Sequence, residues 1–90
     1  MSAPTYAPRH VGVGLTRTPF APDRGIGGMT SVVSLLGVEV GIVNRRPTLD
    51  GFTYQAWPIA GALSVYRGTH LAAAFDALVD KHREAQGATP

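Results

Sequence analysis

The chain contains no cysteine and no long apolar run. The absence of cysteine excludes disulfide bonds, thiolate zinc sites and cysteine nucleophiles, and it fits a reducing compartment. The longest apolar stretch, residues 31–43, is too short to span a bilayer and contains Glu39. Prolines interrupt the N-terminal residues MSAPTYAPRH, where a signal peptide would need an apolar run. We therefore expect a cytoplasmic protein that has no membrane partner.

Charge of either sign is also sparse. The 90 residues include eight basic and six acidic side chains, and the formal net charge is +2. A dedicated nucleic-acid binder usually has a denser basic patch than this composition provides. The bias towards alanine, glycine, proline and arginine indicates a high-GC genome, and we expect a protein of bacterial or phage type.

No combination of residues specifies a catalytic centre. His10 lies near the N-terminus, and His70 and His82 lie about three turns apart on a predicted helix, too far to share a metal ion. The chain has no G-x-S-x-G nucleophile motif, and the glycines of residues 25–28 lack the lysine of a phosphate-binding loop. We expect a non-enzymatic protein without catalytic residues, cofactor, metal site or small-molecule substrate.

The clearest element is a C-terminal amphipathic helix over Thr69–Gln86, with Thr69 as its N-cap. Apolar residues recur at the spacing of one buried helical stripe, at Leu71, Ala74, Phe75, Leu78 and Val79. Asp76, Asp80 and Glu84 recur every four residues and predict an acidic ridge on the solvent side. The stripe needs an apolar sheet face against which it can pack.

Three segments that precede the helix predict strands. Residues 31–45 are rich in valine, isoleucine and leucine, with a bend near Gly37, and residues 52–59 and 62–67 alternate between apolar and polar side chains. In the first strand the even positions, Leu36, Val38, Val40 and Ile42, are predicted to point together towards the helix. The fold class is therefore α+β, a three-stranded antiparallel meander packed on one C-terminal helix.

The N-terminal third predicts no regular element. Prolines and glycines punctuate residues 1–30, which we interpret as an extended arm, followed by a β-β-β-α domain over residues 31–87 and a tail over residues 88–90. The arm is either mobile or docked on a partner. Apolar residues that could anchor it there are Tyr6, Leu15 and Phe20.

The sheet face away from the helix predicts a binding surface. On this face the sequence places Thr53, Gln55, Trp57, Ser64 and Tyr66, with arginines at the rim. Glutamine and arginine can read base edges, arginine and tyrosine can hold phosphates, and tryptophan can stack on a base. The candidate binding residues are Arg45, Arg46, Gln55, Trp57, Tyr66 and Arg67. Alternatively, Trp57 packs beneath the arm.

This order of three strands and one alanine-rich helix resembles the small DNA-binding domains of the AP2 and integrase-arm type. The resemblance covers residues 38–86. Its matching segments are GFTYQAW at residues 51–57, YRGT at residues 66–69 and AAFDA at residues 73–77. It implies a three-strand-plus-helix fold and DNA binding.

Two hypotheses about function remain open. The first is a small binding module that binds DNA through the open sheet face. The second is a protein-binding accessory subunit, virion component or phage-type inhibitor, whose arm becomes ordered on a protein complex. If the first strand is an edge of the sheet, it could also pair with a second copy and form a homo-oligomer.

Overall fold

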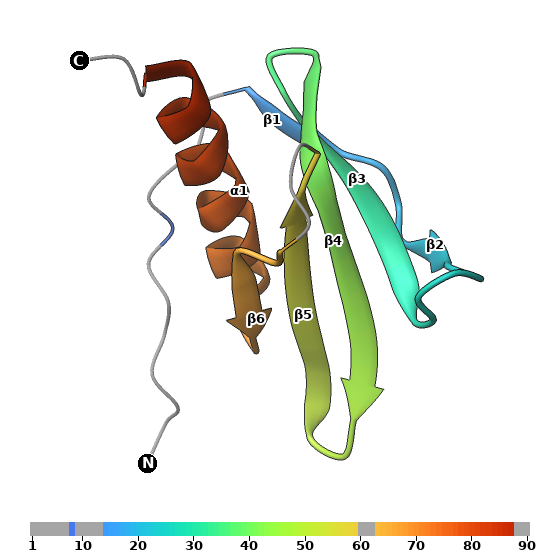
Figure 1. Ribbon diagram of the computed structural model, residues 1–90. Helices are drawn as coiled ribbons and strands as arrows, with labels where there is room; N and C mark the ends of the chain where they lie inside the picture. The colour runs from blue at the N-terminus through green and yellow to red at the C-terminus, as the bar shows by residue number, and fades with distance from the viewer. Residues whose placement is uncertain (1–7, 9–13, 60–62, 88–90) are drawn as a thin grey trace.

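The computed structural model describes residues 8, 14–59 and 63–87, which form an antiparallel sheet and a C-terminal helix (Figure 1). In chain order the elements are β1 (Leu15–Arg17), β2 (Ala21–Pro22), β3 (Met29–Leu35), β4 (Val38–Thr48), β5 (Gly51–Pro58), β6 (Tyr66–Gly68) and α1 (Leu71–Gly87). The predicted α+β class is confirmed, but the described sheet has six strands rather than three. Within these ranges, no helix has the length and apolar character needed to cross a membrane.

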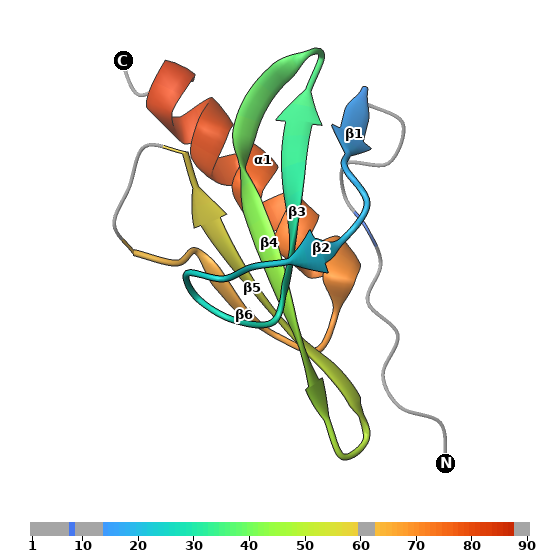
Figure 2. The ribbon, with the colours of Figure 1, turned by 90° about the vertical axis from the view of Figure 1, so that its right-hand side faces the viewer.

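The strands are arranged in the order β1-β3-β4-β5-β6, and β2 also pairs with β3. Each of these pairings is antiparallel. α1 packs on one side of the sheet, against β4, β5 and β6. The loop between β2 and β3 lies on the side away from α1 (Figure 2). We call the two sides of the sheet the helix face and the open face.

The first predicted strand, residues 31–45, is in fact two strands joined by a tight turn. β3 and β4 are separated only by Leu36 and Gly37, whose φ angles are 52° and 82°. Positive φ at both central residues is the geometry of a type I′ hairpin loop, which normally selects Asn-Gly or Gly-Gly. Because leucine is atypical at this position, the sequence predicts only a bend where the chain reverses.

Leu36→Asn is expected to stabilise the protein by roughly 1 kcal/mol, because asparagine tolerates the left-handed conformation better than leucine does. Leu36 is 78% exposed, so its truncation removes little buried surface. The free energy of urea unfolding checks this result. Leu36→Val is the control and should lower stability, since a β-branched residue is disfavoured at positive φ. A loss of stability in Leu36→Asn would contradict the assignment of a left-handed conformation to this position.

A β-bulge in β4 changes which of its residues face the helix. The register between β3 and β4 shifts at Val33 and Ser34, where Val40 has no partner of its own. Val40 is buried as predicted, but beyond the bulge Val43 is buried on the helix face while Ile42 pairs with a residue of the open face. The predicted alternation is therefore right at Val40 and wrong at Ile42, because one extra residue inverts the facing of a strand.

The hydrophobic core lies between the helix face and α1. Its buried members are Val33, Leu35, Val40, Val43 and Ala56 from the sheet, and Ala74, Leu78 and Val79 from α1. Gly41 lets the two layers approach closely, because a Cβ at this position would lie 2.7 Å from Cδ2 of Leu78. Burial of these apolar side chains supplies most of the favourable free energy of folding.

α1 begins two residues later than predicted. The sequence predicts Thr69 as the N-cap, but the helix starts at Leu71, and the carbonyl oxygen of His70 accepts the first helical hydrogen bonds. The His70 N–H donates to Oη of Tyr66 over 3.1 Å. This bond ties the start of α1 to β6. A contact with Tyr66, rather than the predicted cap by the Thr69 hydroxyl, therefore fixes the start of the helix.

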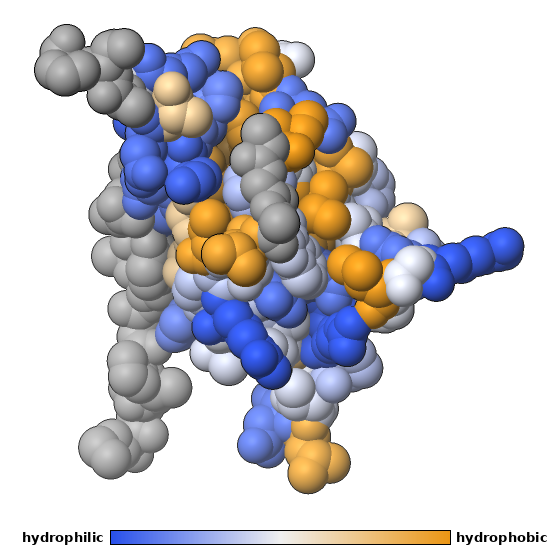
Figure 3. All heavy atoms as spheres, viewed as in Figure 1, coloured by the Kyte–Doolittle hydropathy of each residue, from blue (hydrophilic) through white to orange (hydrophobic). Residues whose placement is uncertain are grey.

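The buried stripe of α1 is wider than the sequence predicts. The predicted stripe is confirmed, with Ala74, Leu78 and Val79 fully buried and Leu71 and Phe75 packed against the core. Asp76, predicted on an exposed ridge, is only 2% exposed, because it shares a face with the buried residues three positions to either side. The outer surface of α1 is hydrophilic (Figure 3). Glu84 is exposed, as predicted, and pairs with Lys81 at 3.3 Å.

Part of residues 1–30, predicted as an arm without strands, belongs to the sheet. β1 and β2 pair with β3. Between them, the N–H of Thr18 donates to the oxygen of Val32 over 2.9 Å, and Oγ1 of Thr18 accepts from the N–H of Val32 over 2.8 Å. Prolines do not prevent this pairing, since Pro19 falls between the strands and Pro22 ends a two-residue edge strand.

Two of the three predicted arm anchors contact this chain's own core. Leu15 pairs with Leu35, and both Leu15 and Phe20 pack against the buried cluster. Tyr6 lies outside the described residues. The apolar side chains of this segment therefore complete the fold, which corrects the expectation that they are held ready for a partner.

The predicted organisation of the sheet edges also needs correction. β3 begins at Met29, so the expected boundary between an arm at 1–30 and a domain at 31–87 falls inside a strand. In the described sheet β3 lies between β4 and the pair β1 and β2, and β4 lies between β3 and β5. Neither half of the predicted first strand therefore offers a free edge through which a second copy could pair and form a homo-oligomer. The predicted tail, residues 88–90, lies outside the described residues.

Candidate functional site

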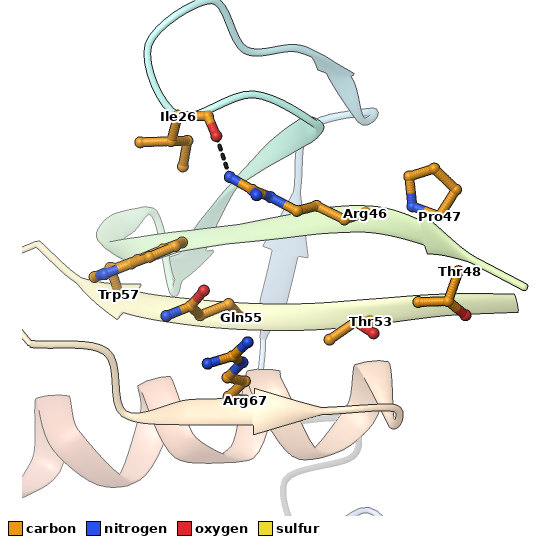
Figure 4. Close-up of a pocket in the computed structure, with 8 residues that line it drawn as sticks. All are labelled: Ile26, Arg46, Pro47, Thr48, Thr53, Gln55, Trp57 and Arg67. Carbon is orange, nitrogen blue, oxygen red and sulfur yellow. Dashed lines mark hydrogen bonds between the residues drawn. The ribbon is translucent and has the colours of Figure 1, made fainter.

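A groove of about 560 Å³ lies on the open face of the sheet (Figure 4). It is lined by Ile26, Arg46, Pro47, Thr48, Thr53, Gln55, Trp57 and Arg67. These residues come from the loop between β2 and β3 and from β4, β5 and β6. We call this hollow the open-face groove.

The strand register brings the polar side chains of the groove together. Arg46 of β4 pairs with Thr53 of β5, and Gln55 of β5 pairs with Arg67 of β6. Residues directly opposite each other share a face, and side chains two positions apart along a strand point the same way. Thr53, Gln55 and Trp57 therefore lie on the face away from the helix, as the sequence predicts.

Arg46 is held in position by two acceptors. Its Nη2 donates to the carbonyl oxygen of Ile26, and its Nε donates to Oδ1 of Asn44 over 3.3 Å. Gly28 permits this contact, because its φ is 64° and a Cβ there would lie 2.9 Å from Cγ of Arg46. A guanidinium carries five N–H donors, so the group is oriented and still has donors for a ligand.

The side of the groove that contains Ile26 is fixed by a polar network. Asp23 Oδ1 accepts from the N–H groups of Gly25 and Ile26 at 2.9 and 3.1 Å, and its Oδ2 accepts from Oγ1 of Thr30 at 2.7 Å. Nδ2 of the buried Asn44 donates to Oγ1 of Thr30 at 3.1 Å and to the carbonyl oxygen of Gly27 at 2.8 Å. The Thr30 hydroxyl and the two backbone donors lower the pKa of Asp23.

This loop is expected to loosen in acid. Because the folded pKa of Asp23 lies below its usual value of 3.8, its hydrogen bonds stabilise the fold above about pH 4 and are lost as the pH falls through the lowered pKa. The protection factor of the Ile26 amide, which is its exchange rate relative to the intrinsic rate at the same pH, should fall in this window when it is followed from pH 6 to pH 2.5. In Asp23→Asn the protection of the Ile26 amide should no longer depend on pH in this window. In Asp50→Asn, which changes an exposed turn, the dependence should be the same as in the parent protein. Equal profiles for both variants would contradict the network.

The candidate residue Arg45 is not in the groove, because neighbours along a strand point to opposite faces. Its guanidinium carbon lies 4.4 Å from the ring centroid of Phe20 and 4.5 Å from that of Phe52. Such cation–π contacts attach the segment before β2 to the sheet. We therefore correct the prediction: Arg45 has a structural role on the helix face.

Tyr66 also lies on the helix face. It pairs with Ala56, which is fully buried, and packs against the core. Its hydroxyl accepts the hydrogen bond from the His70 N–H at the start of α1. The sequence predicts the third strand over residues 62–67, but β6 begins only at Tyr66, and the actual register turns this side chain inwards.

Sequence reasoning missed part of the groove. Ile26 belongs to a segment predicted as an arm, and no local pattern indicates that it contacts the sheet. Thr48, which lines the groove, and Asn44, which lies beneath it and holds Arg46, could have been found, because they alternate with Arg46 along β4 at the period of two that strands impose. The inverted facing at the bulge hid this pattern.

The open-face groove is positively charged. Arg46 and Arg67 are among its eight lining residues, and no acidic side chain is. Trp57 is half-buried, and Ile26, from the segment predicted as an arm, lines the same groove. Across residues 8, 14–59 and 63–87 no group of side chains could hold a metal ion. The groove offers hydrogen-bond donors, an amide and an indole ring.

Comparisons with known proteins assign no family to this geometry. No family model, curated protein or solved structure matches the chain. The resemblance of residues 38–86 to small DNA-binding domains therefore stays a prediction, and the function has to be inferred from the groove itself.

Proposed function

We propose that this protein is a non-enzymatic binding module whose open-face groove binds nucleic acid. One observation carries the proposal: Arg46, Arg67, Gln55 and Trp57 lie in the same hollow, and no acidic residue lines it. A phosphodiester ligand is complementary to this charge, because its phosphates would meet guanidinium groups and no carboxylate.

Each of these side chains has a role that suits such a ligand. Arg46 and Arg67 can form paired hydrogen bonds to phosphate oxygens, since the planar guanidinium matches their geometry. Gln55 has both a donor and an acceptor for a base edge. Trp57 has an apolar ring for stacking. The net charge of +2 is small, so binding would depend on this local arrangement rather than on the charge of the whole protein.

Arg67→Gln is expected to weaken binding to nucleic acid about tenfold, which corresponds to one charged hydrogen bond. Arg67 is exposed on β6, so the fold should not change. Fluorescence anisotropy with a labelled oligonucleotide at low salt measures the affinity. Arg83→Gln is the matched control, because it removes the same charge from an exposed site on α1 and should have little effect. Equal losses in both variants would indicate nonspecific attraction and contradict the proposal.

The alternative is a protein-binding accessory whose N-terminal arm becomes ordered on a partner. Two of its three anchors, Leu15 and Phe20, already pack against the core of this chain, so this hypothesis has less apolar surface to draw on. It is nevertheless preferred if no oligonucleotide binds at about 20 mM salt, where phosphate contacts are strongest.

A further inference from the structure

The open-face groove is a hollow, and its functional side chains lie inside it. Ile26 bounds one side and Arg67 of β6 the other, with Gln55 and Trp57 of β5 between them (Figure 4). Proteins commonly read duplex DNA by inserting a helix or a two-stranded ribbon into its major groove. In a hollow the relation is reversed, because part of the ligand has to enter the protein rather than part of the protein entering the groove of the DNA. This shape favours a ligand with at least one base outside a duplex.

Trp57 adds a second preference. Its side chain lines the groove and is half-buried, on the open face opposite Ile42. Bases in a duplex are stacked on each other, and extruding one costs free energy. Bases of a single strand are free to stack on an aromatic ring without that cost. The indole is therefore more useful to a single strand than to a duplex.

The two arginines are placed to bracket a base. Arg46 on β4 and Arg67 on β6 are two strands apart, which is about 10 Å at the usual spacing of strands in a sheet. The pocket volume of about 560 Å³ is within the range, roughly 300–1,000 Å³, of sites that enclose a small organic ligand. Contacts from Ile26 and Asn44 orient Arg46 before any ligand arrives.

We infer that the ligand of the open-face groove is single-stranded nucleic acid. It lies across β4, β5 and β6, with one base stacked on Trp57 and its flanking phosphates on Arg46 and Arg67. This inference rests on the proposed function and narrows it from nucleic acid in general to unpaired strands.

The chain contains a single tryptophan, so tryptophan fluorescence, excited at a wavelength where tyrosine does not absorb, reports on this groove alone. The full chain is titrated with oligothymidylate, with oligouridylate and with a blunt duplex of equal length, all at low salt. Saturable quenching by the single strands, with affinity at least tenfold above that for the duplex, is the expected result. Tighter binding of the duplex would overturn the inference, and so would single-strand binding that leaves Trp57 fluorescence unchanged.

A variant separates stacking from simple burial of the indole. Trp57→Leu keeps an apolar side chain and should lower the affinity for labelled oligothymidylate about tenfold, whereas Trp57→Phe should retain most of it. Circular dichroism establishes that each variant is folded. If Trp57→Leu does not fold, the comparison of single strand with duplex in the parent protein still decides the matter. Equal affinities of folded Trp57→Leu and the parent would overturn the inference.

Failure of this inference differs from failure of the proposed function. If the duplex binds more tightly, and Arg67→Gln weakens that binding while Arg83→Gln does not, the groove still binds nucleic acid but the preference for single strands is wrong. If neither single strands nor duplex bind at low salt, both proposals are wrong.

Discussion

Leu78→Ala should lower the free energy of unfolding by about 2–5 kcal/mol, the range for truncating a buried leucine. Leu78 is fully buried in the middle of α1, in the cluster that joins the helix to the helix face. The close approach at Gly41 leaves little freedom for the sheet to collapse into the space that its side chain vacates. Since small domains are stable by only about 5–15 kcal/mol, the variant should be partly unfolded at modest temperature. Urea unfolding followed by circular dichroism measures the loss.

Leu63→Ala provides the matched control. It makes the same chemical change at a side chain that is 82% exposed, so it should change stability by no more than about 0.5 kcal/mol. A loss in Leu78→Ala below about 1 kcal/mol would show that α1 is not packed on the sheet as described, because a void in a filled core costs more than this.

Asn44→Ala should both destabilise the protein and weaken ligand binding. Its side chain is 2% exposed and bonds Thr30, the carbonyl oxygen of Gly27 and Nε of Arg46. Loss of these part-buried hydrogen bonds should lower the free energy of unfolding by about 1–3 kcal/mol in total, because a typical hydrogen bond contributes about 1 kcal/mol. The loop between β2 and β3 should then move away from the sheet and release Arg46. Amide exchange at Ile26 and affinity for oligothymidylate report the two effects.

Asn44→Asp and Gln86→Ala test the specificity of this result. Asn44→Asp keeps an oxygen for Arg46 but loses both N–H donors, so its effect on the loop should equal that of Asn44→Ala while Arg46 stays in place. Gln86→Ala removes an amide from an exposed position on α1 and should be silent. If exchange at Ile26 became faster in Gln86→Ala, or did not become faster in Asn44→Ala, Asn44 would not be the residue that holds the loop.

The parts of the fold that the sequence predicts are those with strong local patterns. The stripe of α1 repeats over three turns, so its buried face could be read even though Thr69 is not the N-cap. The alternation of β5 is equally regular and places Gln55 and Trp57 on the open face. In these segments the local pattern and the tertiary packing favour the same structure. Arg46 and Arg67 do not follow from alternation, because the predicted facing of their strands would turn both towards the helix, and only the actual register brings them to the open face.

The remaining features depend on contacts that no local pattern encodes. Leu36 forms a turn that usually takes asparagine or glycine, so one predicted strand concealed a hairpin. The extra residue at Val40 inverts the facing of β4 and moves Arg45 to the helix face. Strands as short as β1 and β2 contain too few residues to show alternation, and only their pairing with β3 reveals them. Ile26 reaches the groove through hydrogen bonds made by Asp23 and Asn44.

The most direct test of the open-face groove is the salt dependence of single-strand binding, followed by Trp57 fluorescence. With phosphates on Arg46 and Arg67, the logarithm of the binding constant should fall with the logarithm of salt concentration at a slope of about −1.4. Arg67→Gln should reduce the slope to about −0.7 and leave quenching at saturation unchanged. A slope that is the same in Arg67→Gln and in the parent protein, or binding without quenching, would contradict the assignment of this groove.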